Sequence, residues 1–132
     1  MTESGSEFQA KVLVVDDYQF NLDMTKDLLE MMNCQVDIAS SGDEAIQHYK
    51  ENAYDLIFLD IQMPNKDGYD TCKEMRTFEK ETGKEHSLII ALTANAMAGD
   101  REKCLSAGMD DYIAKPLRAN TLEATLDKYL KQ

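Results

Sequence analysis

Four short runs of hydrophobic residues are each followed directly by polar side chains that can bind a metal or react. The runs are residues 12–15 before Asp16 and Asp17, 56–59 before Asp60, 88–92 before Thr93, and the weaker run 112–114 before Lys115. Continuous apolar runs, as opposed to alternating ones, are typical of strands buried on both faces of a parallel sheet. Because parallel strands end at the same edge, the pattern predicts one edge with three carboxylates, a hydroxyl and an ammonium group.

Helical patterns lie between these runs and complete a regular alternation of strand and helix. We expect strands at 11–16, 35–39, 55–60, 88–93 and 111–115, and helices at 19–32, 42–51, 69–79, 98–106 and 119–130. Five such units with right-handed crossovers predict a doubly wound parallel sheet of the α/β class. The residues alone do not fix the order of the strands.

Capping residues and apolar spacing define the expected helices further. Ser41 with Glu44 forms a capping box, Gly83 breaks the third helix, and Gly108 suits a left-handed cap after the fourth. The side chains expected to face the core are Tyr18, Leu22, Leu29 and Met32 in the first helix, Ala45, Ile46 and Tyr49 in the second, Cys72 and Met75 in the third, and Leu122, Leu126 and either Tyr129 or Leu130 in the last.

Composition and charge narrow the class of protein. The 132 residues suit one domain, and a net charge of −11 argues against nucleic acid or an anionic membrane as a direct ligand. We expect no membrane span and no signal peptide, so a cytoplasmic location is predicted, with Cys34, Cys72 and Cys104 as reduced, small core residues. Residues 1–10 are expected to be a disordered tail or a cloning remnant, and 11–132 the folded domain.

The acidic residues at the predicted edge indicate a magnesium site. Mg²⁺ prefers hard oxygen ligands, and Asp16, Asp17 and Asp60 supply carboxylates from two strand ends. A backbone carbonyl from the following loop, at Gln62, would add a ligand. Taken alone, the Asp-Asp pair is better explained as the end of a strand and the start of a turn than as a metal site. Asp60, Thr93 and Lys115 at the same edge favour the metal site.

Asp60 is the predicted phosphoacceptor because it is the single acid that follows the most apolar run. A carboxylate can accept a phosphoryl group covalently, and the product carries close to two negative charges. Lys115 is suited to one phosphoryl oxygen as a flexible point charge, and the Thr93 hydroxyl can donate a hydrogen bond to another.

Two other classes of function compete with this interpretation. A magnesium-dependent aspartyl-phosphate phosphatase of the haloacid dehalogenase type carries a second acid two residues after its nucleophile, where this chain has Gln62. A flavodoxin-like cofactor module would have a loop rich in Ser, Thr and Gly after the first strand, where this chain has Asp17, Tyr18 and Gln19. No phosphate-binding Gly-rich motif for a nucleotide is present.

Several motifs together resemble those of a response-regulator receiver domain. They are Val-Val-Asp16-Asp17, Leu59-Asp60-Ile-Gln-Met-Pro64, Asp67-Gly68, Ala-Leu-Thr93-Ala94, Ala107-Gly108-Met109-Asp110-Asp111-Tyr112 and Lys115-Pro116. The stretches 91–97 and 104–112 are most similar to receivers attached to hybrid sensor histidine kinases. The resemblance implies a flavodoxin-like (βα)5 fold with strand order 2-1-3-4-5.

The resemblance also implies roles for individual residues. Asp60 would take a phosphoryl group from a phosphohistidine of a histidine kinase or a histidine-containing phosphotransfer protein, and Mg²⁺ would be held by Asp16, Asp17, Asp60 and the Gln62 carbonyl. Thr93 and Lys115 would contact the phosphoryl group, and Thr93 with Tyr112 would form the switch. Pro116 would follow a cis peptide bond, and Gln62 and Asn95 would tune the lifetime of the phosphate. Such a domain catalyses only its own phosphorylation and dephosphorylation, and it acts through a partner or within a larger kinase.

Overall fold

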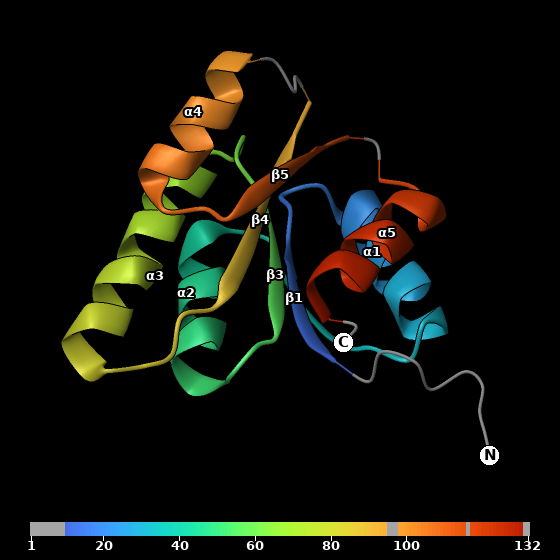
Figure 1. Ribbon diagram of the computed structural model, residues 1–132, viewed down its shortest axis with the longest axis horizontal. Coiled ribbons are helices and arrows are strands. Elements are labelled where there is room, and N and C mark those ends of the chain that lie inside the picture. Colours follow the sequence, from blue (N-terminus) through green and yellow to red (C-terminus); the bar gives the residue numbers. More distant parts are fainter. Residues whose placement is uncertain (1–9, 95–97, 116, 131–132) are drawn as a thin grey trace.

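The computed structural model describes residues 10–94, 98–115 and 117–130, which form a single five-stranded parallel sheet with helices on both faces (Figure 1). The strands are β1 (Lys11–Val15), β2 (Gln35–Ala39), β3 (Leu56–Asp60), β4 (Leu88–Thr93) and β5 (Asp111–Ala114). They lie in the order β2-β1-β3-β4-β5, and each neighbouring pair is parallel. The doubly wound α/β sheet and the order implied by the resemblance are both confirmed.

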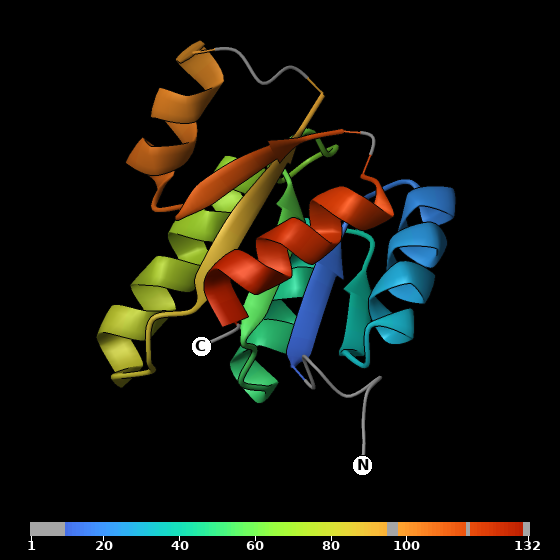
Figure 2. The same cartoon turned by 45° about the vertical axis from the view of Figure 1, so that its right-hand side comes forward.

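The helices lie in two layers. They are α1 (Gln19–Met31), α2 (Gly42–Glu51), α3 (Gly68–Thr82), α4 (Ala98–Ala107) and α5 (Ala119–Leu130). In Figures 1 and 2, α1 and α5 cover one face of the sheet, and α2, α3 and α4 lie on the other. Within the described residues, no helix is both long enough and apolar enough to span a bilayer.

Alternating strand residues build two separate cores, one on each face. Leu13, Ile57 and Ile89 belong to the core beneath α2 and α3, whereas Val14 and Phe58 belong to the core beneath α1 and α5. β3 is buried along its whole length, as the continuous apolar run predicts. The three cysteines are free and buried, which confirms that they are small core residues.

Most expected helix ends are confirmed, with shifts of a few residues. The Ser41 side chain accepts a hydrogen bond from the Glu44 backbone N–H, but the Glu44 carboxylate accepts from Ser40 instead of closing the box on Ser41. α3 continues to Thr82, three residues beyond the expected end at 79. It ends there because the next residue, Gly83, adopts a left-handed φ of 76° and caps the helix. Gly108 has a φ of 103° directly after α4, as expected.

The expected inward face of α1 is partly wrong. Leu22 and Leu29 are buried, but Tyr18 is 61% exposed because it is the N-cap residue and its backbone is extended. Thr25 takes a buried position on this face instead. Ala10, which the sequence placed in the tail, is buried, and its carbonyl accepts a hydrogen bond from Gln35 at the start of β2. Residues 1–9 lie outside the described residues.

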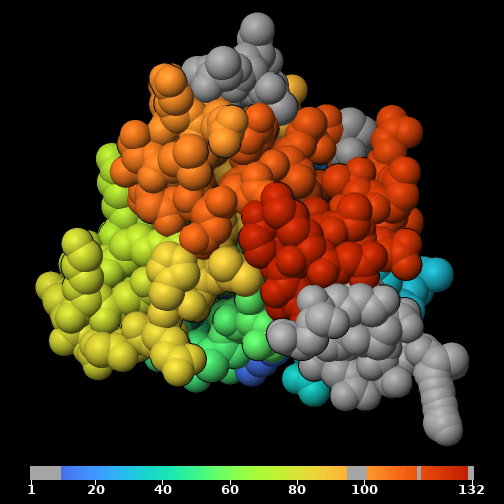
Figure 3. Space-filling model, in the orientation of Figure 1, coloured from blue at the N-terminus to red at the C-terminus, as the bar shows by residue number. Residues whose placement is uncertain are grey.

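A network of polar side chains ties α3 to the start of β4 and to the loop before β5. We call it the Arg76 cluster: its side chains are Arg76, Glu79, His86, Asp110 and Tyr49. The Arg76 guanidinium donates to the carbonyls of Gly108 and Ser87, each at 2.8 Å, and to the carboxylates of Glu79 and Asp110, each at 2.9 Å. The cluster holds the segment that leads from α4 into β5. Figure 3 shows α4, β5 and α5 side by side on one face of the molecule.

Candidate functional site

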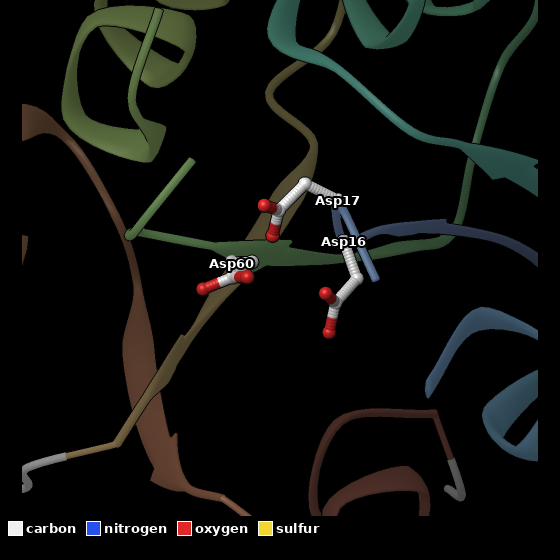
Figure 4. A group of neighbouring side chains, drawn as sticks. All are labelled: Asp16, Asp17 and Asp60. Atoms are coloured by element: carbon white, nitrogen blue, oxygen red, sulfur yellow. The ribbon is translucent and has the colours of Figure 1, made fainter. Parts of the chain in front are cut away.

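Three carboxylates converge where β1 and β3 end, at what we call the carboxyl edge of the sheet (Figure 4). Asp16 and Asp17 follow β1 directly, and Asp60 is the last residue of β3. One carboxylate oxygen from each residue lies within 4.8 Å of the others. The structure therefore brings together the three acids that the strand-end pattern predicted.

The two strands give these acids very different exposure. Asp16 and Asp60 are 3% and 1% exposed, whereas Asp17 is exposed at the mouth of the site. Strand residues two positions apart point to the same face of the sheet. Asp16 therefore points to the same face as Val14, and Asp60 to the same face as Phe58, which is the face covered by α1 and α5. Backbone alternation thus buries two carboxylates beside each other and leaves the third in contact with solvent.

Lys115, which follows β5, is the cation of the site. Its ammonium nitrogen lies 2.9 Å from Asp60 Oδ2 and 3.4 Å from Asp16 Oδ2. Its backbone N–H donates to the Thr93 carbonyl at 2.8 Å, which fixes the end of β5 against the end of β4. One lysine therefore contacts two of the three carboxylates, and the group keeps an excess of negative charge.

Hydrogen bonds to the buried carboxylates are few. Asp60 Oδ1 accepts from the Gln62 backbone N–H at 3.0 Å, and Asp16 accepts from the Tyr18 backbone N–H at 3.0 Å and the Asn21 amide at 3.3 Å. Burial raises the pKa of Asp60 above its usual value, against the opposing effects of Lys115 and the Gln62 N–H. Burial would lower the pKa of Lys115, but its hydrogen bond to Asp60 and the nearby negative charge outweigh burial and raise it.

The donor set fits a magnesium ion. Oxygen ligands about 2.0–2.1 Å from Mg²⁺ lie about 2.9 Å apart when adjacent and about 4.2 Å apart across the ion, so oxygens within 4.8 Å of one another can reach one ion by moving inward. The excess carboxylate charge favours a divalent cation, and the exposed Asp17 leaves room for the waters that Mg²⁺ retains. Asp16, Asp17 and Asp60 are the residues that would hold it.

The loop after β3 requires a glycine at position 68, which the sequence indicates only as part of the Asp67-Gly68 motif. A Cβ at Gly68 would lie 2.5 Å from the Asp60 carbonyl oxygen and 2.5 Å from Ile61 Cα. The Gly68 N–H donates to the Ile61 carbonyl, and the Asp67 side chain caps α3 by accepting from the Asp70 N–H. Gly68 thus lets α3 begin against the strand end that carries Asp60.

The other predicted site residues lie at or near this edge. Thr93 is 2% exposed at the end of β4, and Gln62 is exposed in the loop after Asp60. Tyr112 pairs with Ala91 across the sheet and packs, partly buried, against the core beneath α2 and α3. Asn95 and Pro116 lie outside the described residues, so their expected roles stay predictions.

Comparison with known proteins places the chain in a family. The family model of the response regulator receiver domain matches residues 12–127, and the chain belongs to this family. Hybrid signal transduction histidine kinase L of Dictyostelium discoideum is 40% identical over 98% of this chain, and the histidine-protein kinase BarA of Escherichia coli is 40% identical over 94%. The chain spans only 8% and 13% of the lengths of these two relatives.

Solved structures agree with the fold. The co-crystal structure of the Saccharomyces cerevisiae phosphotransfer protein Ypd1 and the Ssk1 receiver domain matches with a TM-score of 0.86 and 31% identity, covering 92% of this chain and 89% of that one. The receiver domain of the Pseudomonas aeruginosa sensor histidine kinase PA1611, which has magnesium in its active-site cleft, matches with a TM-score of 0.81 and 33% identity over 93% of this chain and 98% of that one. The chain is therefore a receiver domain of the kind found in two-component and phosphorelay systems.

Proposed function

We propose that Asp60 accepts a phosphoryl group in a step that depends on Mg²⁺. The observation that carries the proposal is a buried carboxylate at a strand end, with Lys115 2.9 Å away and two further aspartates beside it. Bound Mg²⁺ would neutralise charge on the phosphoryl oxygens. In addition to Asp16, Asp17 and Asp60, the Gln62 carbonyl is the proposed fourth protein ligand.

The phosphoryl donor that fits this site is a phosphohistidine. The relatives are hybrid histidine kinases, and one solved neighbour is bound to a histidine phosphotransfer protein. An Asp60 oxygen would bond to phosphorus as the nitrogen–phosphorus bond breaks, and the imidazole nitrogen would keep the electron pair. We therefore propose a histidine kinase or a histidine-containing phosphotransfer protein as the partner.

Two residues of the site are positioned to hold the phosphoryl group. Lys115 already contacts Asp60 and would pair with a phosphoryl oxygen. The Thr93 hydroxyl would donate a hydrogen bond to another oxygen from the end of β4. A phosphatase of the haloacid dehalogenase type has its second acid at the position where this chain has Gln62, and an amide cannot act as that acid. This favours a phosphate that persists. Gln62 and Asn95 are the proposed lifetime-tuning residues.

Phosphate incorporation with a small phosphodonor and Mg²⁺ tests the proposal. The wild type should gain one phosphate, and Asp60→Asn should gain none, because the amide cannot form the acyl phosphate. Asp27→Asn, at an exposed acid on α1, should label like the wild type. Full labelling of Asp60→Asn would overturn the assignment.

We further propose that Thr93 and Tyr112 transmit the change to the surface. Movement of Thr93 toward the phosphoryl group would leave space that the partly buried Tyr112 ring can fill. The face formed by α4, β5 and α5 in Figure 3 should then change most. Backbone amide shifts with and without beryllofluoride test this, and changes confined to the loop after β3 would contradict it.

A further inference from the structure

A cavity of about 280 Å³ lies beside the carboxyl edge, between α1 and the segment that joins β5 to α5. Figure 2 shows α1 and α5 on the same side of the sheet. The apolar part of the cavity wall consists of Met24 on α1, Leu92 on β4 and Leu117 before α5. Leu92 and Leu117 are 1% and 7% exposed and belong to the core, whereas Met24 is half-buried, so the cavity has a core wall and opens to solvent on one side.

The remaining wall is polar, and one of its groups has no partner within the part of the chain that the structure describes. Asp16, Asn21 and Lys115 line the cavity and bond to one another or to Asp60. Thr25 also lines the cavity and is 2% exposed. Among residues 10–94, 98–115 and 117–130, its hydroxyl makes no hydrogen bond. Four other helical threonines donate to the carbonyl four residues earlier: Thr71, Thr77, Thr82 and Thr125.

Thr25 thus brings to the cavity wall a buried hydroxyl without a partner in the described ranges, and a ligand could supply one. A buried polar group without a hydrogen bond costs about 1–3 kcal/mol. The apolar wall offers water no hydrogen bonds, so an apolar group placed against it would remove hydrocarbon surface from water. The volume is close to the lower end of the range for small-molecule sites, about 300–1,000 Å³.

We propose that this cavity binds a small, uncharged molecule with an apolar body and one hydroxyl or amide group. The body would lie against Met24, Leu92 and Leu117, and the polar group would bond to the Thr25 hydroxyl. The ligand is uncharged because the wall itself carries one charge of each sign, on Asp16 and on Lys115, which lie 3.4 Å apart. The proposal concerns a second site and does not require phosphorylation of Asp60.

Protein-detected NMR titration of the full chain, without phosphodonor, tests the proposal. Benzyl alcohol carries both features of the ligand, toluene lacks the hydroxyl, and benzylamine replaces it with a cation. Benzyl alcohol should bind saturably with a Kd of about 1 mM or lower and shift the signals of Leu92 and Leu117. Toluene should bind roughly three- to tenfold more weakly, because it leaves the Thr25 hydroxyl unpartnered.

Two isosteric variants separate the hydroxyl's role in binding from its role in folding. Thr25→Val should abolish the preference for benzyl alcohol over toluene without lowering the urea midpoint of unfolding, because its hydroxyl makes no hydrogen bond among the described residues. Thr125→Val, on α5, should lower the midpoint and keep the preference, because its hydroxyl donates to the Thr121 carbonyl at 2.9 Å.

Three results would overturn the proposal. One is the absence of saturable binding by benzyl alcohol, with the signals of Leu92 and Leu117 unmoved, which would mean that the cavity holds solvent only. The second is an unchanged preference in Thr25→Val. The third is a preference for benzylamine that Mg²⁺ competes away, which would place the probe on the carboxylates of the metal site.

Discussion

The carboxyl edge and the Arg76 cluster each place several carboxylates around one cation, but they differ in how fully the negative charge is compensated. Lys115 contacts the buried Asp16 and Asp60, and Arg76 contacts the half-buried Glu79 and Asp110. In the Arg76 cluster, the carboxylates also accept hydrogen bonds from the backbone N–H groups of Ile89 and Ser87. At the carboxyl edge, Asp60 has one backbone donor, and the exposed Asp17 has no partner among the described residues.

The difference separates a structural cluster from a reactive one. The planar guanidinium of Arg76 donates to four groups at once and joins three segments, whereas a lysine ammonium is a flexible point charge that can change partners. Spare carboxylate charge at the carboxyl edge is unfavourable until a cation arrives. The Arg76 cluster leaves no such need, so we expect it to support stability and the carboxyl edge to support chemistry.

Removal of Arg76 should have the largest effect on stability. Arg76→Met leaves the half-buried Glu79 and Asp110 without their cation, and we expect a loss of about 3 kcal/mol in the free energy of unfolding. Urea unfolding measures it, with the exposed Arg101→Met as the control. Under conditions where the variant is folded, Asp60 should still be labelled at the wild-type rate. Loss of labelling without loss of stability would remove the distinction between the two clusters.

Removal of Asp17 should have the converse effect. Asp17→Ala deletes a proposed metal ligand that is exposed and unpartnered, so Mg²⁺ affinity should fall at least about tenfold while stability stays near that of the wild type. Calorimetric titration with Mg²⁺ checks the affinity, and the labelling of Asp60 should fall in parallel. Unchanged affinity would count against the metal site.

Lys115→Ala should change metal binding less and in the opposite direction. Its ammonium group repels a divalent cation, so Mg²⁺ affinity should stay similar or increase, by less than about tenfold. The amide shifts that beryllofluoride induces should still weaken, because the phosphoryl contact is gone. A large loss of Mg²⁺ affinity would mean that the site is arranged differently.

The smallest expected effect is on acid stability, at Asp111 beside the Arg76 cluster. Burial would raise the pKa of Asp111, but hydrogen bonds from the Tyr129 hydroxyl, the Tyr112 N–H and Lys128 outweigh it and lower the pKa below 3.8. The stabilisation is therefore present above pH 3.8 and is lost as the pH falls through the folded-state value.

Asp111→Asn should remove that pH dependence, with a loss of about 1 kcal/mol or less at neutral pH. Urea unfolding between about pH 2.5 and 6 measures it across the acid range in which the carboxyl titrates. Tyr129→Phe removes the strongest opposing hydrogen bond and should reduce the same slope. A slope unchanged in both variants would contradict the assignment.

The sequence predicted the carboxyl edge well because the site consists of strand ends. Continuous apolar runs specify buried parallel strands, and the residue after each run must then lie at the shared edge. Asp16, Asp60 and Lys115 are therefore close together in the structure, although Asp60 and Lys115 are 55 positions apart. Tyr18 was misplaced because apolar spacing cannot distinguish the last residue before a helix from its first turn.

The Arg76 cluster could not be predicted in the same way. Arg76, His86 and Asp110 look like ordinary charged residues in a helix and two loops, and no periodicity connects them. The Gly68 contact with the backbone of β3 and the unpartnered Thr25 hydroxyl are equally invisible, because both depend on which surfaces meet across the sheet.

By itself, the sequence determined the strands and helices, the acids and the lysine at the carboxyl edge, and the family. Local periodicity and the common direction of parallel strands are sufficient for these, because each follows from neighbours along the chain. The tertiary structure decided which carboxylates are buried, which cation compensates each one, and where a cavity remains between α1 and α5. These features depend on how segments distant in the sequence pack together, because that packing sets the hydrogen-bond partners of each polar group and its exposure to water.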